Sequence, residues 1–385
     1  MADAAPLDPE ALESEAREGT GLGDFGGGDF REGLAVLCET YEHAGLKESG
    51  RQRTRARLLH LLQTRLRIAA AFERHPEIRT RPIRRPVYLT GLPRTGTSAL
   101  FNLLGADPAA RPLRLWEGMS PDVPPDFAPG REDPRLTAWK ALHAQDSERN
   151  REFAKIHHVD PEGPEECVLL LAYTFRDVQM GIEPLMEPYG SWFQKQDLRP
   201  SYDYYLDLLR MLDFQRPGDR WLLKSPAHLW ALDILVERLP DACILWTHRN
   251  PLEIIPSYCS MMRVLMNIRE SVDPRELGPT VLEYLARSLE RGLAARDRLD
   301  PDRFVDVDYR RFVADPLGTA EAIYRAFELP LPEATRRALR EHVQAHPQGR
   351  HGRHEYSLEE YGLSPGQVRE RLRFYTERFE VPTGA

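Results

Sequence analysis

Residues 86–104, PVYLTGLPRTGTSALFNLL, read as a strand, a tight glycine loop and a helix. The short run of β-forming residues at 87–89 leads directly into a loop that Gly91 and Gly96 bracket. Thr97 then opens a helix with leucines on one side. Unpaired backbone N–H groups in such a loop, together with the helix dipole, favour an anion. The stretch therefore predicts a phosphate-binding loop.

This loop differs from the phosphate loop of nucleoside triphosphatases at the lysine position. That motif is GxxxxGK[ST], and here Thr97 stands where the lysine would follow Gly96. The cation of the loop is instead Arg94, which lies between the two glycines. An arginine at this place suits a nucleotide phosphate inside the loop and requires no magnesium–triphosphate arrangement. An ordinary turn between strand and helix that happens to hold two glycines is the alternative.

Composition narrows the function classes. The 385 residues are 41% hydrophobic and 29% charged, enough for one large domain or two modest ones. A net charge of −8 argues against a general nucleic-acid binder, and no apolar run approaches the length of a membrane span. The acidic N-terminus lacks the features of a signal peptide, and the four cysteines form no CxxC pair. We therefore expect a cytoplasmic protein without a metal site.

Two further strand–loop–helix units follow the first one. Apolar strands at 221–224 and 242–246 each run into a polar loop and then a helix. This order predicts an α/β fold in which helices flank a P-loop-like central parallel sheet. Residues 1–85 read as a helical N-terminal extension packed on the core, and residues 86–385 as a single α/β domain. The segment 113–118 reads as an additional strand or an extended segment.

Ligands bind at the carboxyl ends of parallel strands, so the loops after these strands should share one rim. We therefore expect Arg94, Lys224, His228 and Arg249 to lie there together. Such a rim offers cations for phosphate groups and a histidine that can exchange protons near neutral pH.

Several motifs together resemble the sulfotransferases that use 3′-phosphoadenosine-5′-phosphosulfate (PAPS), in particular a bacterial, actinobacterial-looking branch. The resemblance covers nearly the whole chain. Its motifs are GLPRTGTS at 91–98, LKSPAH at 223–228, HRNP at 248–251 with Ser257, DYRRFVADP at 308–316 and the loop at 346–360.

The resemblance implies two phosphate sites for PAPS and for its product, 3′,5′-diphosphoadenosine. The first loop would bind the 5′-phosphosulfate through Gly91, Leu92, Pro93, Arg94, Thr95, Gly96, Thr97 and Ser98. Arg249, and Ser257 eight residues further on, would bind the 3′-phosphate. A late basic loop would close over that phosphate through Gly349, Arg350, Gly352 and Arg353.

Two residues compete for the role of general base. In many relatives a histidine that follows a lysine is the base, and His228 with Lys224 fits that pattern. Other branches use a glutamate soon after the first strand–helix unit, and here Glu117 is the candidate. Arg94 and Lys224 would neutralise charge on the leaving group. The chain departs from the animal cytosolic branch at Ala99, where those relatives carry a tryptophan that stacks on adenine.

Two other functions compete with sulfuryl transfer. A nucleotide kinase or other P-loop phosphotransferase is disfavoured by Thr97, and a non-catalytic nucleotide-binding protein of the same fold by the presence of Arg94, Lys224 and His228. The partner is expected to be a small-molecule acceptor with a hydroxyl or amine. Aromatic residues suggest an apolar or aromatic acceptor, with core packing as the alternative reading: Trp192, Phe193, Tyr202 and Tyr205.

Overall fold

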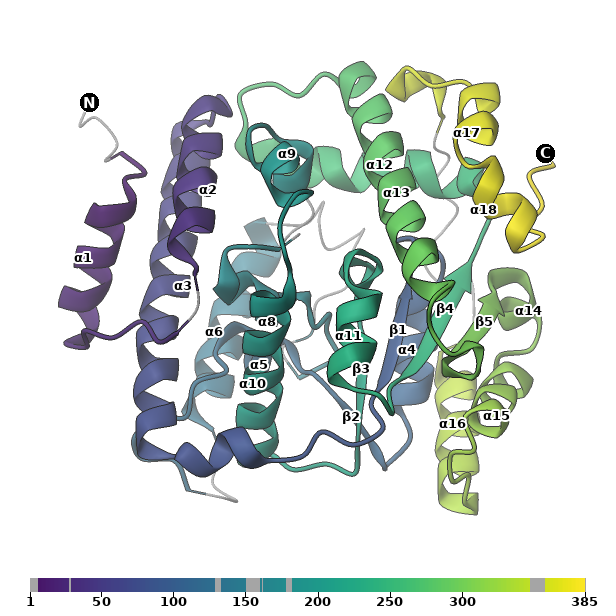
Figure 1. Ribbon diagram of the computed structural model, residues 1–385, viewed down its shortest axis with the longest axis horizontal. Coiled ribbons are helices and arrows are strands. Elements are labelled where there is room, and N and C mark those ends of the chain that lie inside the picture. The colour runs from purple at the N-terminus through teal and green to yellow at the C-terminus, as the bar shows by residue number, and fades with distance from the viewer. Residues whose placement is uncertain are drawn as a thin grey trace.

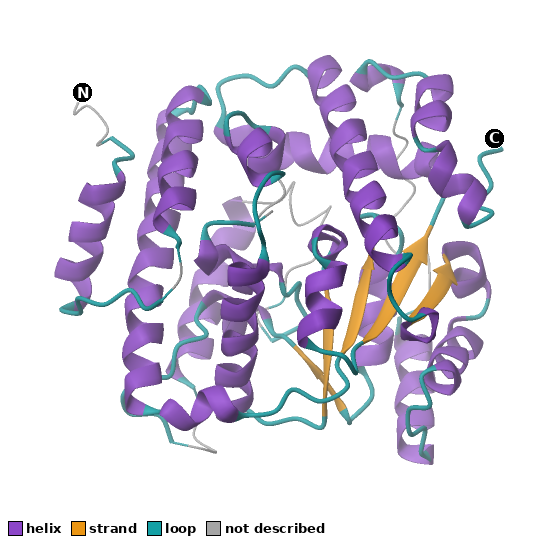
Figure 2. Ribbon diagram, in the orientation of Figure 1, coloured by secondary structure: helices purple, strands orange, loops and turns teal. Residues whose placement is uncertain are grey.

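Five parallel strands form the centre of the molecule, and helices cover both faces of the sheet (Figure 2). The computed structural model describes residues 6–27, 29–128, 133–149, 160, 162–177, 182–346 and 357–384. The strands are β1 (Val87–Gly91), β2 (Ala110–Pro112), β3 (Arg220–Lys224), β4 (Cys243–His248) and β5 (Phe304–Asp308). They stand in the order β2-β3-β1-β4-β5. The predicted α/β fold with a central parallel sheet is confirmed.

The carboxyl ends of the middle strands lie close together at one edge of the sheet. Gly91, the last residue of β1, pairs with Thr247 of β4. Lys224, the last residue of β3, pairs with Leu89 of β1. Because β3 and β4 flank β1 on its two sides, the loops after them lie on either side of the loop after β1.

Helices pack on both faces of this sheet, with α11 and α13 in front of the strands and α4 behind them in Figure 1. One face carries the 3₁₀ helix η4 (Pro226–Trp230), α11 (Leu232–Arg238), α12 (Pro251–Leu265) and α13 (Pro274–Arg296). The other carries α4 (Thr97–Gly105), α15 (Pro316–Ala326) and α16 (Glu333–Ala345). Tyr88 and Trp246 point to the first face, Leu89 and Leu245 to the second. Burial on both faces is typical of a parallel sheet.

The N-terminal helices form a layer on the left of Figure 1, away from β5. They are α1 (Pro9–Thr20), α2 (Arg31–His43), α3 (Glu48–Arg74) and the 3₁₀ turn η1 (Pro76–Thr80). Between this layer and the sheet lie α8 (Val168–Leu171), α9 (Tyr189–Phe193) and α10 (Arg199–Gln215). Leu34 and Leu62 of the layer belong to the same hydrophobic core as Tyr88. The division into an extension, 1–85, and a domain, 86–385, stays a prediction.

The remaining elements connect these layers. They are α5 (Leu115–Met119), α6 (Pro134–Arg149), η2 (Ala172–Thr174), η3 (Glu183–Leu185), η5 (Met266–Ile268), η6 (Pro301–Arg303), α14 (Tyr309–Ala314), η7 (Glu359–Tyr361), α17 (Pro365–Arg371) and α18 (Arg373–Arg378). None of the helices in the described part of the chain has an apolar stretch long enough to cross a membrane.

The strand predicted at 113–118 is wrong, because this segment contains the short helix α5. The strand of this region is β2, which ends just before it. The alternation of apolar and basic residues in Leu-Arg-Leu-Trp imitates a strand. The helix begins there because the Glu117 carboxylate accepts a hydrogen bond from the backbone N–H of Arg114 (2.9 Å), which satisfies a donor at the helix start.

Candidate functional site

The loop after β1 has a left-handed backbone at three positions. Gly91, Arg94 and Gly96 have φ angles of 124°, 66° and 85°. A Cβ atom at Gly96 would lie 2.6 Å from the ring of Tyr309, so the close approach requires glycine there. Gly96 is also the N-cap of α4 and has no side chain to accept hydrogen bonds from the first turn. The backbone N–H groups in the first turn of α4 therefore lack a side-chain cap, and such groups suit an anion.

Arg94 connects this loop to the loop after β4. Its Nε donates a hydrogen bond to the hydroxyl of Ser257 on α12 (3.1 Å). Nη1 of Arg249 donates to the backbone carbonyl of Arg94 (3.0 Å), and the Arg249 guanidinium lies 4.2 Å above the ring of Tyr309. The two predicted phosphate-binding groups are thus adjacent and share one hydrogen-bond network.

Lys224 lies on the other side of the loop, at the end of β3. Its side chain is only 2% exposed, and Nζ donates to the hydroxyl of Ser98 (3.3 Å) and to the carboxylate of Glu166 (2.7 Å). Glu166 is 28% exposed, so its carboxylate is partly open to solvent. The rim therefore combines two arginines, a lysine and a carboxylate around the loop after β1.

Comparison with known proteins shows the family to which the chain belongs. The model of the sulfotransferase family matches residues 86–333. The chain belongs to the sulfotransferase family. A curated relative, omega-hydroxy-beta-dihydromenaquinone-9 sulfotransferase Stf3 of Mycobacterium bovis, is 23% identical over 303 residues, which are 72% of this chain and 71% of the relative.

Two solved structures are similar over almost all of this sulfotransferase. Sulfotransferase STF1 from Mycobacterium tuberculosis is 35% identical, with a TM-score of 0.84, and the match covers 96% of this chain and 99% of that one. Sulfotransferase STF9 from Mycobacterium avium is 27% identical, with a TM-score of 0.89, and the match covers 99% of each chain. The chain is therefore a transferase enzyme, as the sequence motifs indicated.

His228 of the sulfotransferase does not reach the rim with its side chain. The ring is fully buried, with Nδ1 2.9 Å from the hydroxyl of Tyr202 and Nε2 3.1 Å from the thiol of Cys167. The ring of Tyr88 packs edge-on against it at 4.9 Å. Burial lowers the pKa of His228 to about 3. Both ring nitrogens are engaged and the neutral form is strongly favoured, which argues against the predicted role as general base.

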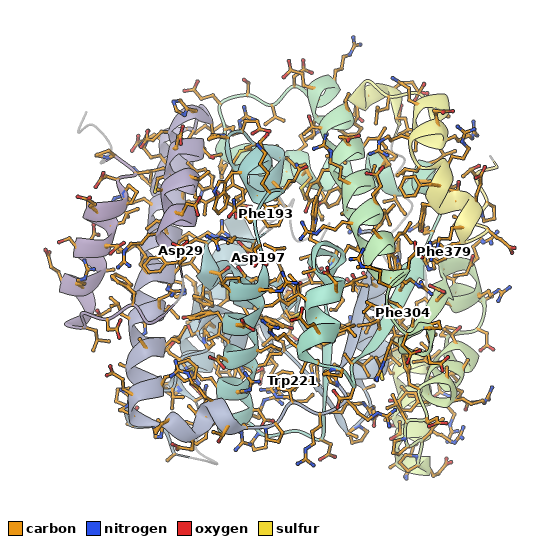
Figure 3. All side chains as sticks on the ribbon, viewed as in Figure 1. Asp29, Phe193, Asp197, Trp221, Phe304 and Phe379 are labelled. Atoms are coloured by element: carbon orange, nitrogen blue, oxygen red, sulfur yellow. The ribbon has the colours of Figure 1, made fainter. Side chains whose placement is uncertain are left out.

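Glu117 is also buried, in an ion pair with two arginines. Its carboxylate lies 2.8 Å from Nη1 of Arg111 and 2.9 Å from Nε of Arg216. The Arg111 guanidinium stacks on the ring of Trp221 (4.1 Å), labelled in Figure 3. Burial alone would raise the pKa of Glu117, but the two guanidinium groups outweigh it and hold the pKa well below its usual range. A carboxylate neutralised this way is a structural ion pair and a poor proton acceptor.

The other predicted loop residues differ in whether they bond within the loop or lie at the start of α4. The hydroxyl of Thr95 hydrogen-bonds to the hydroxyl of Thr247 (2.6 Å) and to the carbonyl of Leu92 (2.7 Å). Thr95 and Leu92 therefore hold the loop together. Thr97 is buried at the start of α4, whereas Ser98 is exposed beside Lys224. Four predicted residues of the late loop lie outside the described residues: Gly349, Arg350, Gly352 and Arg353.

The aromatic residues proposed from the sequence as an acceptor pocket pack in the core instead. Phe193, labelled in Figure 3, is 2% exposed, and Tyr202 and Tyr205 are buried around His228. The indole of Trp192 donates to Glu32 of the N-terminal layer (2.9 Å). Core packing, the alternative reading of these residues, is therefore what the structure supports.

A cavity of about 100 Å³ opens beside the phosphate loop. Pro93, Glu166, Val168 of α8 and Ser225 lie in its wall, and residues of η4, α12 and α13 form the remainder. Sequence reasoning missed Glu166, whose signal in the sequence is the pair of acids directly after Pro164. The cavity residues of α12 and α13 were missed as well.

Proposed function

We propose that the enzyme transfers a sulfuryl group from PAPS to a hydroxyl of a small-molecule acceptor. The observation that carries this proposal is the adjacency of two anion-binding groups, joined by the hydrogen bonds of Arg94 to Ser257 and of Arg249 to the Arg94 carbonyl. PAPS bears phosphate at both the 5′ and the 3′ position, so it matches two such sites. ATP and AMP lack the 3′-phosphate.

The residues fit this donor. We assign the 5′-phosphosulfate to the loop from Gly91 to Ser98 and the first turn of α4, and the 3′-phosphate to Arg249 and Ser257. When bound, PAPS supplies the sulfuryl group and leaves as 3′,5′-diphosphoadenosine. Arg94 and Lys224 balance the negative charge that grows on the leaving phosphate. The late loop with Gly349, Arg350, Gly352 and Arg353 is proposed, from the family resemblance, to close over the 3′-phosphate.

We assign the general base to Glu166 in place of His228 or Glu117. Its carboxylate is the one that lies in the wall of the cavity beside the loop, and it is partly exposed. Its ion pair with Lys224 (2.7 Å) fixes its position at the end of β3, and this supports an assignment beside the sulfuryl group of the donor. A hydroxyl that enters the cavity would meet this carboxylate and give up its proton to it.

Binding of 3′,5′-diphosphoadenosine tests the donor assignment most directly. Calorimetry should give a much higher affinity for the diphosphate than for AMP or ATP, since a charge-assisted contact to the 3′-phosphate contributes about 1.5–3 kcal/mol. Turnover of a radiolabelled donor with a panel of alcohols then tests the reaction. Equal affinity for AMP and the diphosphate would contradict the two-site proposal, and tighter binding of ATP would favour a phosphotransferase.

A further inference from the structure

The cavity beside the phosphate loop has a polar mouth and an apolar interior. Glu166 and Pro93 lie where it meets the loop, on the side of Lys224 and Ser98. Away from the loop its walls are Leu229 and other side chains of η4, α12 and α13. The carboxylate proposed as the base thus stands at the entrance to an apolar chamber.

Aromatic and thioether groups line this interior. The rings of Trp230 and Tyr284 stack at 5.4 Å, and Met261 and Met262 of α12 also line the cavity. Methionine side chains adapt to irregular apolar ligands because they are unbranched and flexible. The interior therefore suits a ligand that adapts its shape, such as a hydrocarbon chain.

The serine hydroxyls of the wall already have partners. Ser288 donates to the carbonyl of Leu285 within α13 (2.8 Å), and the hydroxyl of Ser225 accepts from the N–H of Ala227 (3.1 Å). The other hydroxyls of the wall are the phenols of Tyr258 and Tyr284. A sugar in this chamber would bring more hydroxyl groups than these walls have partners for, which is costly in a buried site. The wall therefore selects against polyhydroxylated acceptors.

The volume sets a limit on the size of the ligand. About 100 Å³ is well below the roughly 300–1,000 Å³ of pockets that enclose a drug-sized molecule. A fused-ring acceptor or a disaccharide does not fit such a space. A short and narrow hydrocarbon chain does fit.

We propose that the apolar part of this cavity takes a narrow aliphatic chain whose hydroxyl lies beside Glu166, so that the acceptor is a primary alcohol of low polarity. The inference rests on the proposed function, whose acceptor class it specifies. In the reaction the alcohol oxygen forms a bond to sulfur and its proton passes to Glu166. The bond between sulfur and the phosphate oxygen breaks, and the electron pair leaves with that phosphate.

A series of straight-chain alcohols tests the chemistry of the cavity. With labelled PAPS, kcat/KM should rise from ethanol to 1-butanol by about fourfold per methylene, the gain expected for burying one CH₂ group, and then level off toward 1-octanol, because about 100 Å³ holds only a few methylene groups. Calorimetric titration of the same alcohols into enzyme saturated with 3′,5′-diphosphoadenosine should show the same trend without turnover. A flat series, or better turnover of glucose or of phenol, overturns the inference.

A matched pair of variants locates the effect. Met261→Glu places a charge in the wall of the cavity and should lower kcat/KM for 1-octanol at least tenfold, while the affinity for 3′,5′-diphosphoadenosine stays within about twofold. Leu265→Glu is the control, since it lies one turn further along α12, is similarly half-buried and does not line the cavity. Equal losses in both variants, or no loss in Met261→Glu, contradict the assignment.

The binding measurement separates failure of the inference from failure of the proposed function. If 3′,5′-diphosphoadenosine binds and the alcohols show no dependence on chain length, only the acceptor class is wrong. If the diphosphate binds no better than AMP, the sulfuryl donor is wrong and the acceptor inference falls with it.

Discussion

The carboxylate of Glu253 accepts hydrogen bonds from two nitrogens of the Arg249 guanidinium, at 2.9 Å from Nε and 2.6 Å from Nη2. Glu253 lies one turn beyond Arg249, in the first turn of α12. A carboxylate and a phosphate bind a guanidinium in the same way. Glu253 therefore occupies the groups of Arg249 that we assign to the 3′-phosphate, and donor binding has to displace it.

Removal of this carboxylate should tighten donor binding. An ion pair exposed to this degree contributes roughly 0.2–1 kcal/mol, so Glu253→Gln should raise the affinity for 3′,5′-diphosphoadenosine by up to about fivefold in calorimetry. Glu290→Gln, which breaks a surface pair with Arg371, is the control and should leave the affinity unchanged. Weaker binding by Glu253→Gln would mean that this carboxylate positions Arg249 and does not compete for it.

Arg249 and Arg94 should fail in different ways when replaced by alanine. The 3′-phosphate does not react, so Arg249→Ala should raise the donor KM by about 10- to 100-fold with little change in kcat. Arg94→Ala should raise KM as well, because Ser257 loses its partner, but it should also lower kcat, because the transition state loses a cation. Arg94→Lys keeps the charge and should restore part of kcat. Steady-state kinetics with the same two signatures for both alanine variants would refute this division of roles.

Local sequence pattern was enough to predict the strands and loops that carry the residues we assign to phosphate binding. The run at 87–89, the two glycines and the opening of α4 are contiguous, so their geometry follows from neighbours in the chain. The parallel order followed from repeated strand–loop–helix units. Arg94, Lys224 and Arg249 consequently lie on one rim, as predicted.

The direction of a side chain at the edge of the sheet could not be predicted from local sequence pattern. His228 follows the rim lysine by four residues, but the 3₁₀ turn of η4 directs its ring into the core beside Tyr88. Glu117 follows the first strand–loop–helix unit in the sequence, but its carboxylate forms ion pairs with Arg111 and Arg216. Glu166 gains its place only through tertiary contact with Lys224, 58 residues away. The direction and the partners of these side chains depend on packing between distant segments, which a local sequence pattern does not reveal.

Glu166→Gln tests the choice of base. The amide keeps the shape of the side chain but accepts no proton, so kcat should fall by roughly 10²–10⁴-fold while the affinity for 3′,5′-diphosphoadenosine is not reduced. His228→Gln should keep kcat within about tenfold. The reverse pattern, with an active Glu166→Gln and an inactive but folded His228→Gln, would restore His228 as the base.

Glu117→Gln should destabilise the protein and spare catalysis. Loss of the carboxylate leaves the buried guanidinium of Arg111 without its partner, which typically costs about 3–5 kcal/mol. The free energy of unfolding in urea should fall by about this amount, with kcat per folded molecule nearly unchanged. Arg216 is more exposed, and Arg216→Gln should cost less. A stable and inactive Glu117→Gln would instead favour Glu117 as the base.

His228 should make the stability of the fold depend on pH. Burial lowers its pKa from 6.5 to about 3, so as the pH falls below 6.5 the unfolded chain binds a proton that the folded protein does not. The contribution of neutral His228 to the free energy of unfolding is fully retained above pH 6.5. It is lost progressively as the pH falls toward 3. Burial lowers the pKa of His248 as well, which adds to the same trend. Urea midpoints at about pH 7.5 and about pH 5 should therefore differ more in the wild type than in His228→Gln, which lacks the titrating ring but retains polar groups for Tyr202 and Cys167. An equal drop in both proteins would show that His228 is protonated in the folded state, and that the ring reaches solvent after all.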